Sequence, residues 1–225
     1  MKGVCLLSGG LDSTVNLAYA RREMEIVLCL TADYGQLAAR REIEAAQRLA
    51  RHYNIPHRVV RLPFLARLDT SALTGRRDLP SLEMDELDDH ARATETARAV
   101  WVPNRNGLLI NVAACYAETL GAGRIVVGFN REEAATFPDN SAAFLDAVNR
   151  ALACSTHNRV QVVSYTLRLT KEDIVRLGNR LGVPWAFVWS CYRGEKEPCG
   201  HCESCRRLQR AFLQAKGEDD AHLLS

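Results

Sequence analysis

Residues 8–14 read Ser-Gly-Gly-Leu-Asp-Ser-Thr and follow directly on the apolar run GVCLL at 3–7. Glycine tolerates left-handed backbone and close approach of another group, and the N–H groups that open a helix attract phosphate. The stretch lacks the GxxxxGK[ST] pattern of a Walker loop. It could also be a tight strand–helix turn with Asp12 or Ser13 as N-cap. We predict a phosphate loop, in which Asp12 holds the Mg²⁺ that also binds the phosphates.

A second acidic residue follows the next apolar run. Asp33 lies in the stretch TADYGQ at 31–36, directly after the run IVLCLT. Acidic side chains at the corresponding edge of nucleotide-binding folds bind ribose hydroxyls. Asp33 could equally cap the helix that follows, and both roles could hold together.

Four of the eight cysteines fall within fifteen residues, in the stretch CYRGEKEPCGHCESC. They are Cys191, Cys199, Cys202 and Cys205. Two CxxC steps bring thiolates to one ion, and four thiolates fill the tetrahedral shell of a structural zinc. In a reducing compartment such a cluster indicates a metal rather than disulfides. An iron–sulfur cluster could use the same thiolates, and His201 is a competing ligand, but we expect zinc and call residues 191–205 the knuckle.

The elements that must position these residues follow from alternating patterns. We expect strands at 3–7, 26–31, 57–62, 124–129 and 159–164. Helices with an apolar face cover 109–120 and 144–152, and a capping-box start at Thr170 and Asp173 opens a third helix that Gly182 and Pro184 end. This alternation predicts an α/β, Rossmann-like fold: a parallel sheet with helices on both faces and ligands at the carboxyl ends of the strands.

Two domains are expected. Residues 1–185 form the nucleotide-binding α/β domain, and residues 186–225 form a zinc-binding subdomain with a helix at 203–215. Residues 69–100 interrupt the first domain. They are polar, acidic in the middle and poor in strand formers, which indicates either a solvated loop or an active-site lid.

Composition excludes some classes of function. The net charge of +2 does not favour a general nucleic-acid binder, and we interpret the basic run RRLQR at 206–210 as a solvated helix face. No run approaches the roughly 18 apolar residues of a membrane span. The first residues run directly into the phosphate loop without the pattern of a signal peptide. We expect a cytoplasmic location.

Together, the SGGLDST loop, the DYGQ stretch and the knuckle resemble the 7-cyano-7-deazaguanine synthase family of the ATP pyrophosphatase (PP-loop) superfamily. WVPNRN at 101–106 and GFN…FPD at 128–139 extend this resemblance from residue 4 to about 213. It implies a sheet of the adenine nucleotide α-hydrolase type. It also implies an AMP-forming ligase that converts 7-carboxy-7-deazaguanine and ammonia into the nitrile preQ0, with release of AMP and pyrophosphate, on the pathway to queuosine and archaeosine.

The resemblance also implies residue roles. ATP is bound by Leu7, Ser8, Gly9, Gly10, Leu11, Asp12, Ser13, Thr14 and Asp33. Asp12 and Arg105 are catalytic. The deazaguanine pocket is formed by Gly128, Asn130, Phe137 and Asp139, with Phe137 stacking on the ring and Asp139 accepting from its N–H donors. ATP with Mg²⁺ and structural Zn²⁺ are the expected cofactors. We expect a homodimer that acts on small molecules, with no membrane and no stable nucleic-acid partner.

Two departures from the family pattern keep alternatives open. Leu37 and Ala38 stand where the family commonly has arginine and histidine, and Arg40 or Arg41 could replace them. Asn140 and Ser141 follow Asp139 in place of Cys-Arg. The chain could therefore be a PP-loop ligase that joins the activated carboxylate to another amine, or a tRNA-modifying PP-loop enzyme. A zinc-knuckle module that binds RNA is a further alternative.

Overall fold

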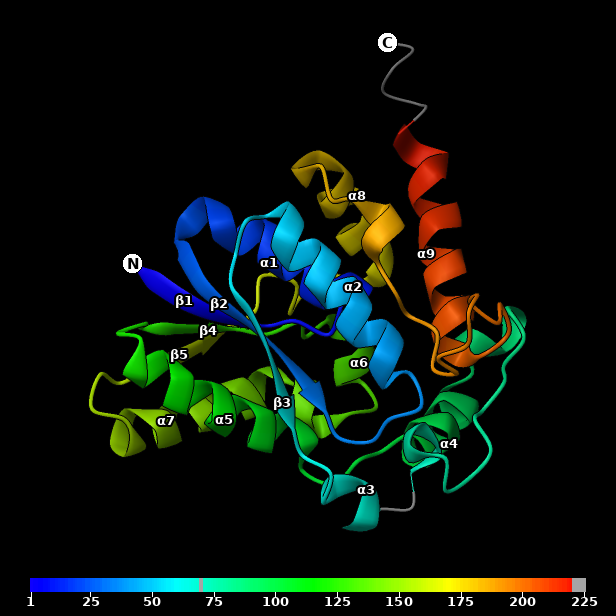
Figure 1. Cartoon of the computed structure of the whole chain (residues 1–225). Coiled ribbons are helices and arrows are strands. Elements are labelled where there is room, and N and C mark those ends of the chain that lie inside the picture. Colours follow the sequence, from blue (N-terminus) through cyan, green and yellow to red (C-terminus); the bar gives the residue numbers. More distant parts are fainter. Residues whose placement is uncertain (69–70, 220–225) are drawn as a thin grey trace.

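The computed structural model describes residues 1–68 and 71–219, which fold around one parallel sheet (Figure 1). Its five strands are β1 (Lys2–Leu6), β2 (Glu25–Asp33), β3 (His57–Arg61), β4 (Arg124–Val126) and β5 (Gln161–Val163). Their order is β3-β2-β1-β4-β5, and every neighbouring pair is parallel. The strand order reverses between β1 and β4, and in such sheets this switch point is where ligands bind. The predicted Rossmann-like α/β fold is confirmed.

Helices cover both faces of this sheet, as predicted (Figure 1). On one face, α1 (Leu11–Glu23) and α2 (Ala39–His52) bury Leu17 and Leu49 against the sheet. On the other face, α5 (Arg105–Thr119) and α7 (Ala142–Ser155) bury Ile110 and Leu152. None of the helices within the described residues is long and apolar enough to span a membrane.

A third apolar cluster joins the C-terminal helix to the rest of the molecule. It contains Val15 of α1, Ile174 of α8 (Lys171–Leu181) and Ala211 of α9 (Glu203–Asp219). Figure 1 shows α9 standing beside α8. The start of α8 is the expected capping box of Thr170 with Asp173, and its end is Gly182 in left-handed backbone. The helix α9 thus shares a core with α1 and α8. The expected domain boundary at 185/186 stays a prediction.

The segment 69–100 is more ordered than a solvated loop; its residues 69–70 lie outside the described residues. It contains the 3₁₀ turns Ala72–Thr74 and Asp85–Asp88 and the helix α4 (His90–Ala99). Asp89 is the N-cap of α4, and its side chain accepts hydrogen bonds from two main-chain N–H groups of the first turn. Leu73 and Leu82 are buried. Ser81 forms a bridge with Cys202, and its hydroxyl donates to the His201 carbonyl at 2.9 Å. The solvated-loop interpretation is therefore wrong for the described part of the segment, because Leu73 packs in an apolar cluster with Tyr34 and Leu65, and Ser81 holds the segment to the knuckle.

The remaining short elements lie between these parts. They are α3 (Leu65–Leu68), α6 (Arg131–Ala134) and the 3₁₀ turns Pro138–Asn140 and Trp185–Phe187. Of these, α6 is important for the site, because it begins directly after the chain leaves β4 and the segment Val127–Asn130.

Candidate active site

The phosphate loop joins β1 to α1 through glycine backbone. Gly9 has a φ of +81°, and a Cβ there would lie 2.7 Å from the Ala45 Cβ of α2. Only glycine lets the loop pass this close to α2. Gly10 is the N-cap of α1, and within the described residues no side chain caps this helix. The alternative with Asp12 or Ser13 as N-cap is therefore wrong, and the first N–H groups of α1 remain available to an anion.

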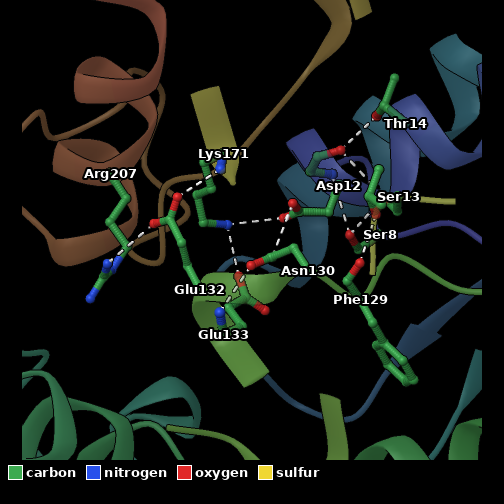
Figure 2. A network of polar contacts seen from close by, with 12 residues as sticks. Ser8, Asp12, Ser13, Thr14, Phe129, Asn130, Glu132, Glu133, Lys171 and Arg207 are labelled. Atoms are coloured by element: carbon green, nitrogen blue, oxygen red, sulfur yellow. Dashed lines mark hydrogen bonds and ion pairs between the residues drawn. The ribbon is translucent and has the colours of Figure 1, made fainter. Parts of the chain in front are cut away.

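The loop hydroxyls have two different surroundings (Figure 2). Ser8 and Ser13 line the cavity described below, and their hydroxyls share a hydrogen bond of 3.0 Å. The Thr14 hydroxyl instead donates to the Gly10 carbonyl at 2.6 Å, and Thr14 is fully buried. Thr14 therefore fixes the shape of the loop, and its predicted contact with ATP stays a prediction.

A cavity of about 300 Å³ opens beside this loop. Of the residues predicted for the site, the lining includes Leu7, Ser8, Gly10, Leu11, Asp12, Ser13, Arg105, Gly128 and Phe137. The others, Gly9, Thr14, Asp33, Asn130 and Asp139, do not line it within the part of the chain that the structure describes. The lining also includes Trp189, Ser190, Tyr192, Glu203, Ser204 and Arg207, so the knuckle region and α9 contribute to the cavity.

Asp12 lies in a network of ion pairs that sequence reasoning missed (Figure 2). The Lys171 Nζ lies 3.0 Å from the Asp12 Oδ2 and 2.8 Å from the Glu133 Oε1. The Asn130 side chain donates to the Asp12 Oδ1 at 3.1 Å. A lysine in the first turn of a helix opposes the helix dipole, and this is the signal that could have indicated acidic partners.

Burial and charge act against each other in this network. Burial raises the pKa of Asp12, and the Lys171 charge only partly offsets this. Burial alone would lower the pKa of Lys171, but Asp12 and Glu133 outweigh it and raise the pKa above its ordinary value. The pKa of Glu133 is lowered, because the Lys171 charge and hydrogen bond outweigh the effect of burial. Lys171 therefore stays protonated at neutral pH.

Arg105 projects into the cavity from the start of α5. Its Nη1 donates to the Tyr34 hydroxyl at 3.1 Å, and the guanidinium lies 5.7 Å from the centre of the Tyr34 ring. Burial alone would lower its pKa, but Tyr34, Asp139 and Glu42 outweigh it and raise the pKa. The cavity thus holds a permanent planar cation, which suits a carboxylate or phosphate.

The predicted substrate residues are divided between the cavity and its support. At Gly128 a Cβ would lie 2.7 Å from the Ser13 N, so the chain must leave β4 early to pass the phosphate loop, and β4 ends before the predicted residue 129. Phe137 lines the cavity and stacks on Trp101 with ring centres 6.2 Å apart. Asn130 is fully buried and contacts the site through Asp12. The Asp139 Oδ1 accepts from the side chain of Asn140, which lines the cavity.

Two expectations about the second strand and α2 are settled by geometry. The Asp33 carboxylate accepts from the Gly35 N–H at 3.2 Å, while the N-cap of α2 is Ala38, so Asp33 does not cap that helix. Arg40 and Arg41 both form ion pairs with Glu44 and lie outside the cavity lining. The structure therefore gives no support to the idea that Arg40 or Arg41 takes over the role of the arginine and histidine that the family commonly has at positions 37 and 38.

The four knuckle cysteines lie together. Their sulfur atoms are all within 4.8 Å of one another, and all are free thiols. The Cys199 N–H donates to the Cys191 Sγ at 3.4 Å, and the Cys202 N–H donates to the Cys199 Sγ at 3.3 Å. The hydrogen bond from Cys205 helps to lower the pKa of Cys202 to about 5, which favours a thiolate ligand. The cluster fits one tetrahedral metal ion, with His201 exposed beside it.

The basic run at 206–210 is not a solvated face. Arg207 donates to Glu203 at 2.8 Å and lies 3.7 Å from Glu132, while Arg206 pairs with Glu83 at 3.1 Å. These two arginines and Arg210 are largely buried in ion pairs that join α9 to α6 and to the segment before α4. That interpretation of the run is wrong, because each positive charge has an acidic partner from a distant part of the chain.

Comparisons with known proteins show the family to which the chain belongs. Residues 2–216 match the family described as "Queuosine biosynthesis protein QueC". The chain is 66% identical over 217 residues to the 7-cyano-7-deazaguanine synthase of Desulforudis audaxviator, covering 96% of this chain and 99% of that protein. It is 57% identical over 213 residues to the synthase of Desulforamulus reducens, covering 94% and 93%.

Among solved structures, a 4-thiouridine synthetase–RNA complex with bound ATP has a TM-score of 0.51 and 20% identity, covering 96% of this chain and 50% of that chain, which is a likeness in fold alone. The matches to synthases have much higher sequence identity, and the family match includes both the phosphate loop and the knuckle. The chain therefore belongs to the 7-cyano-7-deazaguanine synthase family.

Proposed function

We propose that the cavity binds ATP and 7-carboxy-7-deazaguanine, and that this chain makes the nitrile from the carboxylate and ammonia. The observation that carries the proposal is the uncapped start of α1, which faces a cavity that also contains Lys171 and Arg105. The start of α1 and the Arg105 guanidinium thus offer positive potential to one space, and Lys171 offsets the charges of Asp12 and Glu133 beside it. Family membership supports this reaction over ligation to another amine or modification of tRNA.

The reaction balances as two adenylations. A carboxylate oxygen attacks the α-phosphorus of ATP, pyrophosphate leaves, and ammonia displaces AMP to give the amide. The amide oxygen attacks the α-phosphorus of a second ATP and pyrophosphate leaves; loss of AMP with the two amide protons then gives the nitrile. Both carboxylate oxygens end on AMP, so each nitrile formed consumes two ATP.

The residues of this chain supply binding and orientation. The N–H groups of α1, with the Ser8 and Ser13 hydroxyls, bind the pyrophosphate, and Lys171 offsets its charge. Arg105, held by Tyr34, orients the substrate carboxylate through paired N–H donors. Phe137 covers the deazaguanine ring.

The two expected metals differ in how well the residues fit them. Zn²⁺ fits the four knuckle cysteines, which leave no open position and so give the ion a structural role. Mg²⁺ would be held by Asp12 and would offset the charge of the leaving pyrophosphate. The Asp12 Oδ2 binds Lys171 and the Oδ1 binds Asn130, so Mg²⁺ would use a remaining lone pair of the carboxylate or displace one of these contacts.

A cytoplasmic location and a homodimer stay predictions. The location is supported by the cysteines, all of which are free thiols. Size-exclusion chromatography with light scattering tests the homodimer.

Product analysis tests the proposed function. The purified chain is incubated with ATP, Mg²⁺, ammonium and 7-carboxy-7-deazaguanine, and the products are identified by mass spectrometry. We expect the nitrile with two AMP per molecule. Formation of ADP and phosphate would contradict the cleavage of ATP between the α and β phosphates. An amide that accumulates without nitrile would contradict the second adenylation.

A further inference from the structure

We propose that Glu42 accepts the N–H donors on the pyrimidine edge of the deazaguanine, and so selects a base that carries a 2-amino group. This inference rests on the proposed function and assigns to that function a specificity residue on α2. Glu42 lies one helical turn after the start of α2 and lines the cavity on the side of Tyr34, Leu73 and Arg105.

The partners of the cavity carboxylates separate Glu42 from the rest. Five carboxylates line the cavity: Asp12, Glu42, Glu132, Glu133 and Glu203. Four of them form ion pairs with Lys171, Arg207 or Arg210. Among the described residues Glu42 alone of the five has no ion pair, and its hydrogen-bond partner is the neutral amide of Gln36. Glu42 is therefore the cavity carboxylate that is free to bind a neutral donor.

Gln36 holds Glu42 in one orientation. The Gln36 Nε2 donates to the Glu42 Oε2 at 2.8 Å and to the Ala32 carbonyl at 3.0 Å, while the Gln36 Oε1 accepts from the Tyr34 N–H at 2.9 Å. Gln36 is 5% exposed, so its own hydrogen bonds are complete and it cannot turn toward a ligand. It fixes the orientation of the carboxylate and uses one lone pair of Oε2, so Oε1 and the second lone pair of Oε2 can accept two parallel donors.

The surroundings of Glu42 favour a neutral ligand edge over a cation. Tyr34, Leu73 and Val100 are buried and belong to one apolar cluster, which Phe137 joins. Burial raises the pKa of Glu42, although Gln36 and Arg105 oppose this. A carboxylate in such surroundings gains most from hydrogen-bond donors that replace its lost hydration.

The pattern of donors identifies the base. The pyrimidine edge of a deazaguanine carries a ring N–H beside an amino group, and these two parallel donors match one carboxylate. The adenine amino group lies beside ring nitrogens that are acceptors, which would repel a carboxylate oxygen. Glu42 therefore fits the deazaguanine and not the adenine of ATP.

The position of Glu42 also agrees with the direction of the reaction. Arg105 acts electrostatically on both Glu42 and Glu133, so one guanidinium is within range of both ends of the site. The 7-carboxylate lies across the bicyclic ring from the donor edge. A base held by Glu42 thus points its carboxylate away from the Glu42 side chain, within the range over which Arg105 acts. Asp139, the acid expected from the sequence, lies outside the cavity lining and binds Asn140.

A thermodynamic cycle between protein and ligand tests the inference. Dissociation constants are measured for 7-carboxy-7-deazaguanine and for the analogue that lacks the 2-amino group, with wild type and with Glu42→Gln. Wild type should bind the analogue roughly 10- to 100-fold more weakly, the loss expected for a hydrogen bond to a charged group. Glu42→Gln should bind the natural ligand weakly and discriminate less than about 3-fold, while the KM for ATP stays near that of wild type.

The matched control is Glu44→Gln, which removes an exposed carboxylate two residues along the same helix, paired with Arg40 and Arg41. It should leave both dissociation constants unchanged. If Glu42→Gln does not fold, Glu42→Asp, which withdraws the carboxylate by one methylene, should reduce the discrimination instead.

Three results would overturn the assignment: full discrimination in Glu42→Gln, lost discrimination in Asp139→Asn but not in Glu42→Gln, or a raised KM for ATP alone. Failure of the proposed function gives a different result, because wild type would then form neither AMP nor nitrile, whatever the variants bind.

Discussion

The main-chain N–H of Trp189 donates to the Gly9 carbonyl at 2.9 Å and so joins the segment before the knuckle directly to the phosphate loop. The Trp189 indole N–H donates to the Cys191 carbonyl, also at 2.9 Å. One residue thus links a cysteine of the metal cluster to the loop that faces the cavity. A metal at the cysteines therefore supports the shape of the active site as well as the stability of α9.

Replacing Cys202 with serine should release the metal and weaken ATP binding. The three remaining thiolates leave the knuckle without a complete ligand set, and Trp189 loses its fixed position against Gly9. We expect loss of bound zinc, a lower Tm and an ATP dissociation constant raised roughly 10-fold. Metal analysis, thermal unfolding and calorimetric titration measure the three effects.

Cys115→Ser is the control, because Cys115 is an exposed free thiol outside the cluster. It should retain metal, Tm and ATP affinity. If Cys202→Ser lost its metal and still bound ATP as tightly as wild type, the contact of Trp189 with Gly9 would not couple the metal site to ATP binding.

Replacing Lys171 with methionine should destabilise the fold. The change leaves Asp12 and Glu133 facing each other without their shared cation. Their side chains are only 16% and 34% exposed, respectively, so water does not fully replace the lost ion pairs. We expect a loss of roughly 2–3 kcal/mol in the free energy of unfolding, below the range for fully buried pairs because Glu133 is partly solvated. Urea denaturation measures it.

Asp12→Asn in the Lys171→Met background should recover part of this loss, because it removes one of the two unpaired charges. Arg40→Met removes a pair whose arginine side chain is 84% exposed and should cost at most about 0.5 kcal/mol. If Lys171→Met and Arg40→Met lowered the free energy of unfolding equally, this would contradict the expected difference between a largely buried and an exposed ion pair.

The cost of Lys171→Met should depend on pH in a defined way. The pKa of Lys171 is raised above 10.5, so the stability that its charge contributes is complete below that value and is lost only as the pH rises through the higher folded value. The pKa of Glu133 is lowered from 4.5, so its contribution is present above 4.5 and is lost as the pH falls through the lower folded value. Without Lys171 the pKa of the buried Asp12 should rise further, so the cost should be at least as large at about pH 9 as at about pH 6. A cost that falls steadily across this interval would contradict a protonated Lys171.

Local patterns were sufficient to predict much of this molecule. The phosphate loop, the capping box at Thr170 and the two CxxC steps each depend on residues within one turn or two of each other. The partners of Lys171 could not be predicted in this way, because Asp12 and Glu133 are brought to it from other elements by the sheet order. For the same reason the sequence alone does not distinguish the paired arginines of α9 from a solvated face.

The other differences between prediction and structure depend on which side chains are buried. Asp139 and Glu42 are both acidic residues near helix starts, and the sequence gives no sign of which one reaches the cavity. The contact that distinguishes Glu42 comes from Gln36, whose side chain turns back over β2. Leu73, Leu82 and Leu87 lie in a polar segment without a regular apolar pattern, so the sequence alone does not indicate that they are buried.

Gly128→Ala should displace the phosphate loop. A Cβ at this position would lie 2.7 Å from the Ser13 N and 3.0 Å from the Asp12 carbonyl carbon, and both are main-chain atoms that cannot turn aside. The start of α1 must therefore move, which we expect to cost roughly 1–3 kcal/mol in stability and to raise the KM for ATP at least about 10-fold. Gly123→Ala, just before β4, is the matched control, because a Cβ there meets nothing within 4 Å. Chemical denaturation and steady-state AMP release measure the two quantities. An alanine at 128 that leaves both at their wild-type values would show that the loop can give way without losing its hold on the phosphates.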